Sequence, residues 1–359
     1  MTDTSRPTPR VLLAAFQGWG DAGEAATDTL QHLSGLLDVE PLHTIGSSGF
    51  IDLQAHRPKL TRGPGGVRSL EWPDTRLLGP VARPAHDQPF IQPDARDVTD
   101  AQSSDFAEAE DQAHDQTPRP VDDERMRRID GSPVTEVYLL AGYEPAYHWQ
   151  DFAEEIVDLV DTWAIDTVIL IGSMYAEAPH SRQIATTITS ENARLREASG
   201  AELSSYEGPV GIMTVIEMAL TAADVPAMSL WAQVPHYVHS APSPKATLAL
   251  LDKLEELLDV VIPRGELLAQ SNDWESHINR IAAGDEEMSQ YIRTLERARD
   301  EALAAGTTGD AIALEFEKLL GAMPGEVLPG APHPRDAAAG PDPDQDQGPE
   351  ATGPQPEEP

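Results

Sequence analysis

The amino-acid sequence predicts an α/β fold: a mostly parallel sheet covered by helices, with a helical extension at the C-terminus. Short apolar runs predict the sheet, because continuous apolar runs are typical of strands buried on both faces. The clearest runs are Val11–Phe16, Val137–Ala141 and Thr167–Ile171. Segments with helical periodicity alternate with these runs, and this order predicts parallel strands joined by helices that pack on the sheet.

The α/β domain is expected over residues 10–263, after a disordered lead at residues 1–9. Its first strand is followed by a glycine-rich turn and a helix over about 21–37. Residues 42–45 predict the next strand. Two short strands are then expected on either side of the Pro73-Asp74 turn, at 67–72 and 76–78, and we expect them to form a hairpin.

A change of composition interrupts the domain. From residue 83 to 131 Pro, Asp, Gln, Ala and Glu dominate and no hydrophobic period remains. Such a segment cannot bury enough apolar surface to offset its ordering entropy. We therefore expect an acidic, disordered insertion that leaves the domain at a surface turn.

Alternation of strands and helices resumes after the insertion. The helix with the clearest pattern contains Trp149, Phe152, Ile156 and Val160 on one face. A Ser-Pro pair at 243–244 predicts another helix start. The further elements expected here are a strand at 184–189, a helix at 210–223 and a strand at 227–234.

The C-terminal part is predicted to be helical over 264–322. Helices are expected at about 264–283, from Asp285, and from Asp310 to a stop at Gly321. Residues 323–359 are acidic and rich in Pro and Gly, and we expect a disordered tail.

Charge and composition limit the classes of partner. The formal net charge of −36 would repel nucleic acid and anionic lipid, so neither is expected as a partner. The chain has no cysteine, which excludes disulfides and thiolate metal sites. No apolar run approaches the roughly 20 residues that span a bilayer. We expect a cytoplasmic protein.

The first candidate site is the turn after the first strand, where Gly18, Gly20, Asp21 and Gly23 match G-x-G-x-x-G. This pattern could bring a pyrophosphate to a helix N-terminus. The acidic residue expected about 20 positions later is missing, because Ile45-Gly46-Ser47 stands there. The alternatives are a different anion at the same helix end, or a tight turn in which Asp21 and Glu24 form a capping box.

Three further catalytic candidates follow predicted strands. Glu144 could act as a general acid or base, or could simply be polar in a turn before Pro145. His180 could move protons, and Arg182 beside it could bind a carboxylate or phosphate. Both could instead be packed and paired within a loop. His236 also follows a predicted strand and is a further catalytic candidate. The alternative is that His236 is a histidine packed in its loop.

Gly208 and Gly211 belong to a Gly/Pro turn whose backbone amides could hold an anion, although turn geometry alone also explains them. His236 and His239 lack the further ligands that a zinc site requires, so no metal site and no cofactor are expected. The sequence contains no G-x-S-x-G and no P-loop motif.

Taken in order, several segments resemble the proteasome assembly chaperone 2 family. The resemblance covers about residues 10–82 and 132–322. The segments that carry it are Phe16–Gly23, Glu144-Pro145 with Trp149 and Phe152, Pro179–Arg182, Tyr206–Gly211, Ser229–Trp231 with Pro235–Tyr237, and Tyr291–Glu296.

The resemblance implies a fold similar to nucleoside phosphorylases and, in the bacterial branch, a homo-oligomer such as a trimer. Eukaryotic relatives are assembly chaperones for the proteasome α-ring. We therefore expect a non-catalytic, assembly-chaperone-like interaction protein whose partner is a protein such as a proteasome subunit. The alternative is an enzyme that binds an anionic ligand at the strand ends, either similar to nucleoside phosphorylases or hydrolases, or a ligase of the ATP-grasp label that the family also carries.

Overall fold

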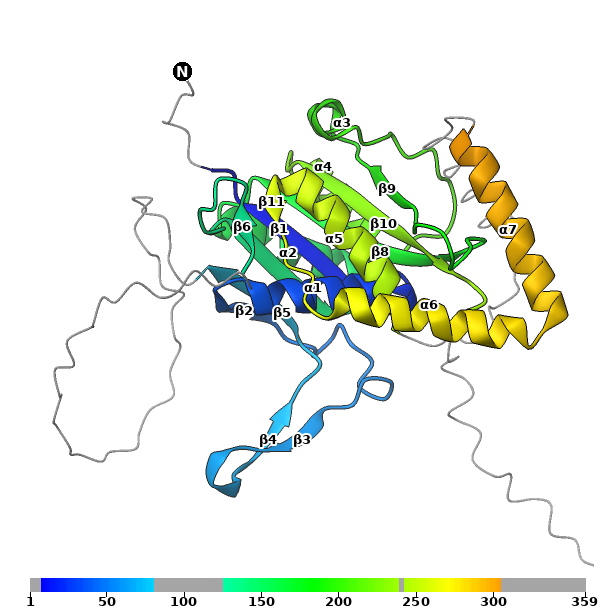
Figure 1. Ribbon diagram of the computed structural model, residues 1–359. Helices are drawn as coiled ribbons and strands as arrows, with labels where there is room; N and C mark the ends of the chain where they lie inside the picture. The colour runs from blue at the N-terminus through cyan, green and yellow to red at the C-terminus, as the bar shows by residue number, and fades with distance from the viewer. Residues whose placement is uncertain (1–7, 81–124, 239–241, 305–359) are drawn as a thin grey trace, which may run out of the picture.

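The computed structural model describes residues 8–80, 125–238 and 242–304, which form a seven-stranded sheet covered by helices (Figure 1). The order of strands across the sheet is β2-β5-β7-β1-β8-β10-β9. The predicted α/β fold, with its mostly parallel sheet and C-terminal helices, is confirmed.

The middle of the sheet is parallel. Strand β1 (Val11–Gln17) lies between β7 (Val137–Tyr143) and β8 (Thr167–Ala176), and β10 (Ala227–Pro235) pairs with the other edge of β8. Their apolar runs are buried on both faces, as expected of central parallel strands. All four strands therefore end at the same edge of the sheet, here called the carboxyl-end edge.

Antiparallel strands complete both sides of the sheet. Strand β9 (Thr186–Thr189) pairs with β10, and β5 (Thr75–Pro80) pairs with β7 and with β2 (Val39–Ile45). These outer strands are shorter or more exposed than the central ones, which suits the edge of a sheet.

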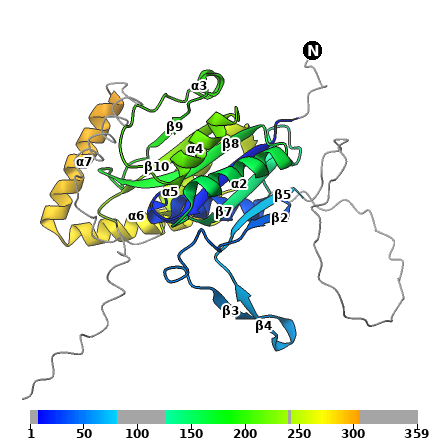
Figure 2. The same cartoon turned by 180° about the vertical axis from the view of Figure 1, so that it is seen from behind.

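Helices cover the two faces in pairs (Figures 1 and 2). Helices α1 (Ala25–Leu36) and α5 (Pro244–Leu258) pack on one face, with Leu30, Leu33 and Leu250 in a common core. Helices α2 (Trp149–Thr162) and α4 (Ile212–Ala222) pack on the other face, where Phe152 makes edge-to-face contacts with Phe16 and Phe50.

As far as residue 304, where the described part of the chain ends, the C-terminal extension contains helices α6 (Leu267–Ala283) and α7 (Glu286–Ala304). Helix α6 packs against α5, and α7 returns toward the body of the protein (Figure 1). The short helix α3 (Ala193–Ser199) was not predicted, and its backbone is capped by Asn192. The elements η1 (Ala22–Glu24) and η2 (Pro64–Gly66) are single 3₁₀ turns.

The predicted hairpin around Pro73-Asp74 is wrong. Strand β4 (Arg68–Glu71) pairs instead with β3 (Lys59–Arg62), and β5 joins the main sheet. The turn of this hairpin is the Gly-Pro-Gly-Gly segment at 63–66, where positive φ angles at Gly65 and Gly66 suit glycine. The resulting two-stranded ribbon projects from the body (Figure 2).

The boundary predicted for the acidic insertion also differs from the structure. Residues 125–131 belong to the fold: Met126 is buried, and strand β6 (Arg127–Arg128) pairs with β11 (Val260–Val261). The rest of the insertion, the lead at 1–7, the helix expected from Asp310 and the tail lie outside the described residues. Among the described helices, none is long and apolar enough to cross a membrane.

Close strand contact predicts the effect of a methyl group at Gly142. A Cβ at Gly142 would stand 2.1 Å from Thr75 Oγ1 and 2.9 Å from Thr75 Cα, across the β5–β7 pairing. We expect Gly142→Ala to lower the free energy of unfolding by about 1–3 kcal/mol. Urea unfolding measures the change. Gly35→Ala is the control, because a Cβ there meets nothing within 4 Å. This substitution lies in helix α1 and should stabilise the protein by up to about 1 kcal/mol. Equal effects of both substitutions would contradict the packing argument.

Candidate functional site

The carboxyl-end edge brings together the segments that the sequence singled out. Gly18–Gly23 follow β1, Glu144 follows β7, His180 lies in the loop after β8, and His236 follows β10. The structure separates them into two groups of contacts. One surrounds Glu144, and the other surrounds His180.

In the first group, the Glu144 carboxylate joins two distant backbone segments. Its Oε2 accepts a hydrogen bond of 2.8 Å from the Trp19 N–H, and its Oε1 accepts one of 3.1 Å from the Ile212 N–H. The Glu144 N–H donates to the Gln17 carbonyl at 2.9 Å. Glu144 therefore fastens the turn after β1 to the first turn of α4.

Gly18 and Gly211 leave room for this carboxylate. A Cβ on Gly18 would lie 2.7 Å from Glu144 Cβ, and a Cβ on Gly211 would lie 3.1 Å from both Glu144 Oε1 and Trp19 Cε3. The positive φ of Gly18 (159°) also lies at the limit of the region that favours glycine. The Glu144 carboxylate thus binds the N-terminus of α4, directly after the Gly208–Gly211 turn whose backbone amides we predicted could hold an anion.

Asp21 occupies the N-terminus of α1 in the same way. Its Oδ1 accepts hydrogen bonds from the Ala26 N–H at 2.9 Å and the Thr27 N–H at 3.2 Å. Burial raises the pKa of this carboxyl above 3.8, against the opposing effect of its Thr27 and Ala26 hydrogen bonds. Asp21 thus satisfies backbone donors in the first turn of α1, although the N-cap residue of that helix is Glu24 and not Asp21. The capping box is wrong, because Glu24 is in a left-handed conformation and its side chain caps nothing.

The remaining glycines of this turn make close backbone contacts. The Gly20 carbonyl accepts a 2.8 Å hydrogen bond from the Ser173 N–H, and the Gly23 carbonyl accepts one of 2.8 Å from the Ser243 N–H. A Cβ on Gly23 would lie 2.7 Å from Ser243 Cβ. Binding of a ligand by these glycines stays a prediction.

Gly208 lies in the turn that leads to α4. A Cβ at this position would stand 2.3 Å from the Tyr206 hydroxyl, which donates to the Pro209 carbonyl at 2.8 Å. The Tyr206 side chain thus folds back over its own turn.

In the second group, His180 is buried and held through both ring nitrogens. Asn279 Oδ1 lies 3.1 Å from His180 Nε2 and can only accept, so Nε2 carries the proton of the neutral ring. Nδ1 is then an acceptor and receives the proton of the Tyr237 hydroxyl at 2.8 Å, while Tyr237 Oη accepts the His180 N–H at 2.8 Å. Burial lowers the pKa of His180 below 6.5, and nearby Lys245 acts in the same direction, while the Asn279 hydrogen bond opposes both.

Arg182 is paired with helix α7. Its Nε and Nη2 donate to the two oxygens of Asp300 at 2.8 and 2.9 Å, and its Nη1 lies 3.4 Å from Glu296 Oε1. This is the bidentate geometry in which arginine binds carboxylates most strongly. Ser181 also donates to Glu296. We call the contacts of the 180–182 loop with α6 and α7 the C-terminal clasp.

His236 and Lys245 extend the C-terminal clasp. His236 Nδ1 lies 3.2 Å from the Ala176 carbonyl, which can only accept, and its Nε2 lies 3.5 Å from the Tyr291 hydroxyl. Lys245 donates to the His180 carbonyl at 2.6 Å and to Glu275 at 2.5 Å. Sequence reasoning identified the loop residues but missed their partners on α6 and α7, which have the pattern of exposed helix positions.

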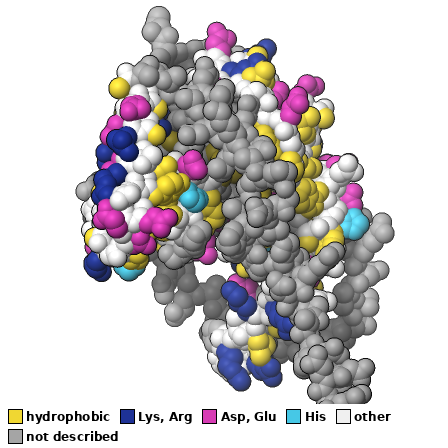
Figure 3. Space-filling model, turned by 90° about the vertical axis from the view of Figure 1, so that its right-hand side faces the viewer, with side chains coloured by type: hydrophobic (Ala, Val, Ile, Leu, Met, Phe, Trp, Pro, Cys, Tyr) yellow, Lys and Arg dark blue, Asp and Glu magenta, His cyan; other side chains and the backbone are white. Residues whose placement is uncertain are grey.

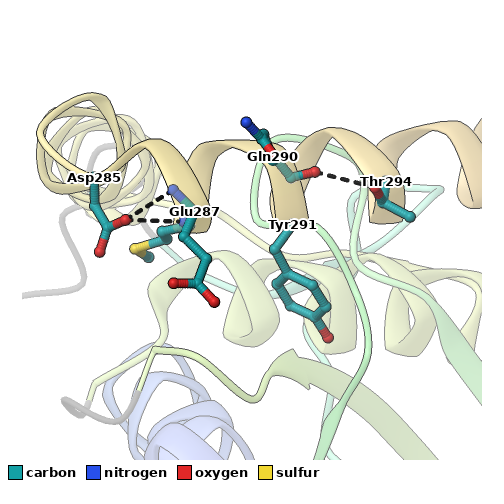
Figure 4. A pocket seen from close by; sticks show the side chains of 6 residues that line it. Asp285, Glu287, Gln290, Tyr291 and Thr294 are labelled. Atoms are coloured by element: carbon teal, nitrogen blue, oxygen red, sulfur yellow. Dashed lines mark hydrogen bonds between the residues drawn. The ribbon is translucent and has the colours of Figure 1, made fainter.

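A hollow of about 540 Å³ lies along α7. Tyr291 points from the helix toward the body, while Asp285 accepts hydrogen bonds from the first turn of α7 (Figure 4). Burial raises the pKa of Tyr291, with Glu177 adding to the effect. The residues that line the hollow are Asp285, Glu287, Met288, Gln290, Tyr291 and Thr294. Across the described ranges, no group of His, Asp and Glu is arranged to hold a metal ion.

Comparison with known proteins decides the family. The model of the PAC2 family matches residues 15–282, which is more than half of the chain. This chain belongs to the PAC2 family.

Solved structures of PAC2 relatives cover most of this chain. A PAC2 family protein from Streptomyces avermitilis is 31% identical, with a TM-score of 0.61 over 78% of this chain and 98% of that one. A proteasome-assembly chaperone homologue from Mycobacterium tuberculosis is 32% identical, with a TM-score of 0.58 over 79% of this chain and 99% of that one.

A more distant structure shares only the fold. PbaB of Pyrococcus furiosus, an archaeal proteasome activator, is 13% identical, with a TM-score of 0.50 over 77% of this chain and 95% of that one. No curated protein matches the chain.

The Glu144 contacts predict a loss of stability when one oxygen is replaced. In Glu144→Gln, the amide group would face either the Trp19 or the Ile212 N–H, so one donor would lose its acceptor. We expect the free energy of unfolding to fall by about 1–3 kcal/mol, measured by urea unfolding at pH 7. Glu155→Gln, an exposed position on α2, is the control and should change it by less than about 0.5 kcal/mol. A Glu144→Gln protein as stable as the control would show that these hydrogen bonds contribute little.

Burial of neutral His180 predicts a pH dependence. Its folded pKa lies below the unfolded value of 6.5, so the folded state binds fewer protons and stability falls as pH drops below 6.5. Asp28 acts oppositely: burial first, then Glu24 and Asp21, raise its pKa from 3.8 to about 6, which favours the folded state as pH falls from 6 toward 3.8. The measurement should therefore use an Asp28→Asn background.

In that background, urea unfolding between pH 7.5 and 5 is compared with and without His180→Gln. Relative to the His180→Gln protein, the protein with His180 should lose stability as the pH falls, by less than about 1.4 kcal/mol per pH unit. Asp21 and Glu217, whose pKa values burial also raises, are present in both proteins and cancel in this difference. An unchanged slope after the substitution would rule out His180 as the titrating group.

Proposed function

We propose that this protein is a non-catalytic, assembly-chaperone-like interaction protein whose partner is a proteasome subunit. The observation that carries the proposal is membership of the PAC2 family together with 32% identity to a proteasome-assembly chaperone homologue. The distant likeness to PbaB adds only that the same fold occurs in a proteasome activator.

The contacts at the carboxyl-end edge support a structural role for the candidate residues. Both oxygens of Glu144 accept backbone hydrogen bonds, and both ring nitrogens of His180 have partners. Arg182 is engaged by Asp300. A catalytic or anion-binding role would first require these contacts to break, so the enzyme alternative is not favoured.

A small apolar surface beside Glu144 is suited to a protein partner. Trp19 is 58% exposed although its backbone N–H is bound by Glu144, and Val210, which precedes Gly211 in the chain, is 42% exposed. The Trp19 ring packs against Gly211, which limits its freedom before binding. Preorganised, exposed tryptophan is typical of the residues that dominate binding energy at protein interfaces. We place the partner contact here.

The oligomeric state and the cellular location are also part of the proposal. The resemblance to the bacterial branch of the family favours a homo-oligomer, such as a trimer, that works in the cytoplasm. Sedimentation of the full chain over a range of concentrations measures the oligomer, and a monomer at all concentrations would contradict it.

A binding assay with purified proteasome α and β subunits of the same organism tests the function. We expect saturable binding of an α subunit, weakened at least tenfold by Trp19→Ala because the central apolar anchor is removed. Leu268→Ala is the matched control, since Leu268 on α6 is 56% exposed and lies in another part of the chain. It should bind as the unmodified protein does.

Two results would contradict the proposal. One is absence of binding to either subunit or to their assembly intermediates. The other is a rise of Tm with phosphate, nucleosides or ATP, because a ligand that binds only the native state stabilises it and would favour the enzyme alternative.

A further inference from the structure

The β3–β4 ribbon has two faces of different character. Its strands pair in antiparallel register, with Lys59 opposite Glu71, Leu60 opposite Leu70, Thr61 opposite Ser69 and Arg62 opposite Arg68. Because side chains alternate between the faces of a strand, the leucines and arginines share one face. The other four residues share the second.

The polar side chains of the second face find their partners within the ribbon. Thr61 Oγ1 and Ser69 Oγ are hydrogen-bonded at 2.8 Å, and Lys59 lies opposite a residue of the other charge. Cross-strand pairs of both kinds stabilise a sheet. This face needs no partner.

The first face is different, and we call it the cationic face. Leu60 and Leu70 are each 54% exposed, and Trp72, two residues further along, is 44% exposed. Arg62 and Arg68 stand directly opposite each other, which is a destabilising arrangement of like charges. Within the part of the chain that the structure describes, neither arginine makes an ion pair.

The charge of the ribbon contrasts with the rest of the chain. Residues 57–72 contain four basic side chains and one acidic one, in a chain of net charge −36. In Figure 3 the projecting lower part of the described surface carries Lys and Arg beside apolar side chains. The combination of exposed apolar groups and unpaired cations fits an acidic polypeptide that also carries apolar residues.

The chain itself contains such a polypeptide. Residues 81–124 include twelve acidic and three basic side chains, and also Phe90, Ile91 and Phe106. This segment leaves the fold directly after β5, which begins four residues after β4 ends. It is therefore tethered one strand away from the ribbon.

The length of the segment allows it to reach the ribbon. Strand β5 has six residues and spans about 20 Å, while half of segment 81–124 could extend over about 70 Å. A tether of this kind gives an effective concentration on the order of millimolar, so even weak contacts would be occupied. The acidic C-terminal tail has a similar charge but is attached beyond α7, on another side of the protein (Figure 1).

We infer that the cationic face of the β3–β4 ribbon is a docking surface for the acidic segment 81–124 of the same chain. Arg62 and Arg68 bind its carboxylates, and Leu60, Leu70 and Trp72 bind its apolar side chains. An acidic partner that uses the ribbon must then displace this segment first.

Energy transfer between two labels in the full chain tests the inference. The chain has no natural cysteine, so Ser69→Cys and Ser104→Cys place a donor and an acceptor without competing thiols. Ser69 lies on the second face, where a label leaves the cationic face free. We expect efficient transfer at about 0.02 M salt and at least a twofold loss at about 0.5 M, where exposed charges are screened.

Substitutions identify the face that binds. Arg62→Ser/Arg68→Ser should lower the transfer at low salt by at least half, and Leu60→Ser/Leu70→Ser should lower it as well. Arg57→Ser/Lys59→Ser removes the same charge away from the cationic face and should leave the transfer near its original value.

Three results would overturn the inference: low transfer at both salt concentrations, equal losses in the two charge-removing pairs, or transfer between singly labelled chains after mixing. The last would assign the surface to a second copy of the chain. Transfer from Ser69→Cys to a label in the C-terminal tail, in place of Ser104→Cys, would overturn it in favour of the tail.

Discussion

The edge where the parallel strands end is organised by charged and polar groups that the protein satisfies internally. Glu144 accepts hydrogen bonds from the backbone of Trp19 and Ile212. Trp19 lies in the turn after β1, and Ile212 begins α4, the helix that leads to β10. Asp21 supplies the same kind of acceptor to α1. Helix N-termini at this edge commonly bind anionic ligands, and here carboxylates of the chain hold these positions. Leaving the backbone N–H groups of Trp19 and Ile212 unpaired would cost free energy, so their hydrogen bonds to Glu144 hold both turns in place. Gly18 and Gly211 lie beside these bonds because a side chain there would clash with the Glu144 carboxylate.

Pairing of polar groups also connects the sheet to the C-terminal helices. His180, Arg182 and His236 stand at strand ends, and each has a partner on α6 or α7. The contacts are polar and mostly specific in direction, so they determine where the helices lie more than they add to the apolar core. The edge is thus divided between a part covered by α6 and α7 and a part, around Trp19, that is exposed to solvent.

The sequence was sufficient to predict the central, parallel strands of the sheet, because they are unbroken apolar runs buried on both faces. It also led to Glu144, His180 and Arg182, since strand ends are where such folds gather polar residues. It could not give Asn279, Glu296 or Asp300 as partners, because that depends on how α6 and α7 pack against the body. The β3–β4 pairing was missed although Gly63–Gly66 offered a turn signal.

The separation of Arg182 from Asp300 along the chain has a consequence for biosynthesis. These residues are 118 positions apart, so at typical elongation rates roughly 6–24 s pass between their addition to the chain. Every strand of the sheet leaves the ribosome before α7 does. A nascent chain can therefore complete its hydrophobic layers while the loop at 180–182 still faces solvent, and helix α7 covers that loop only after α7 itself has been translated.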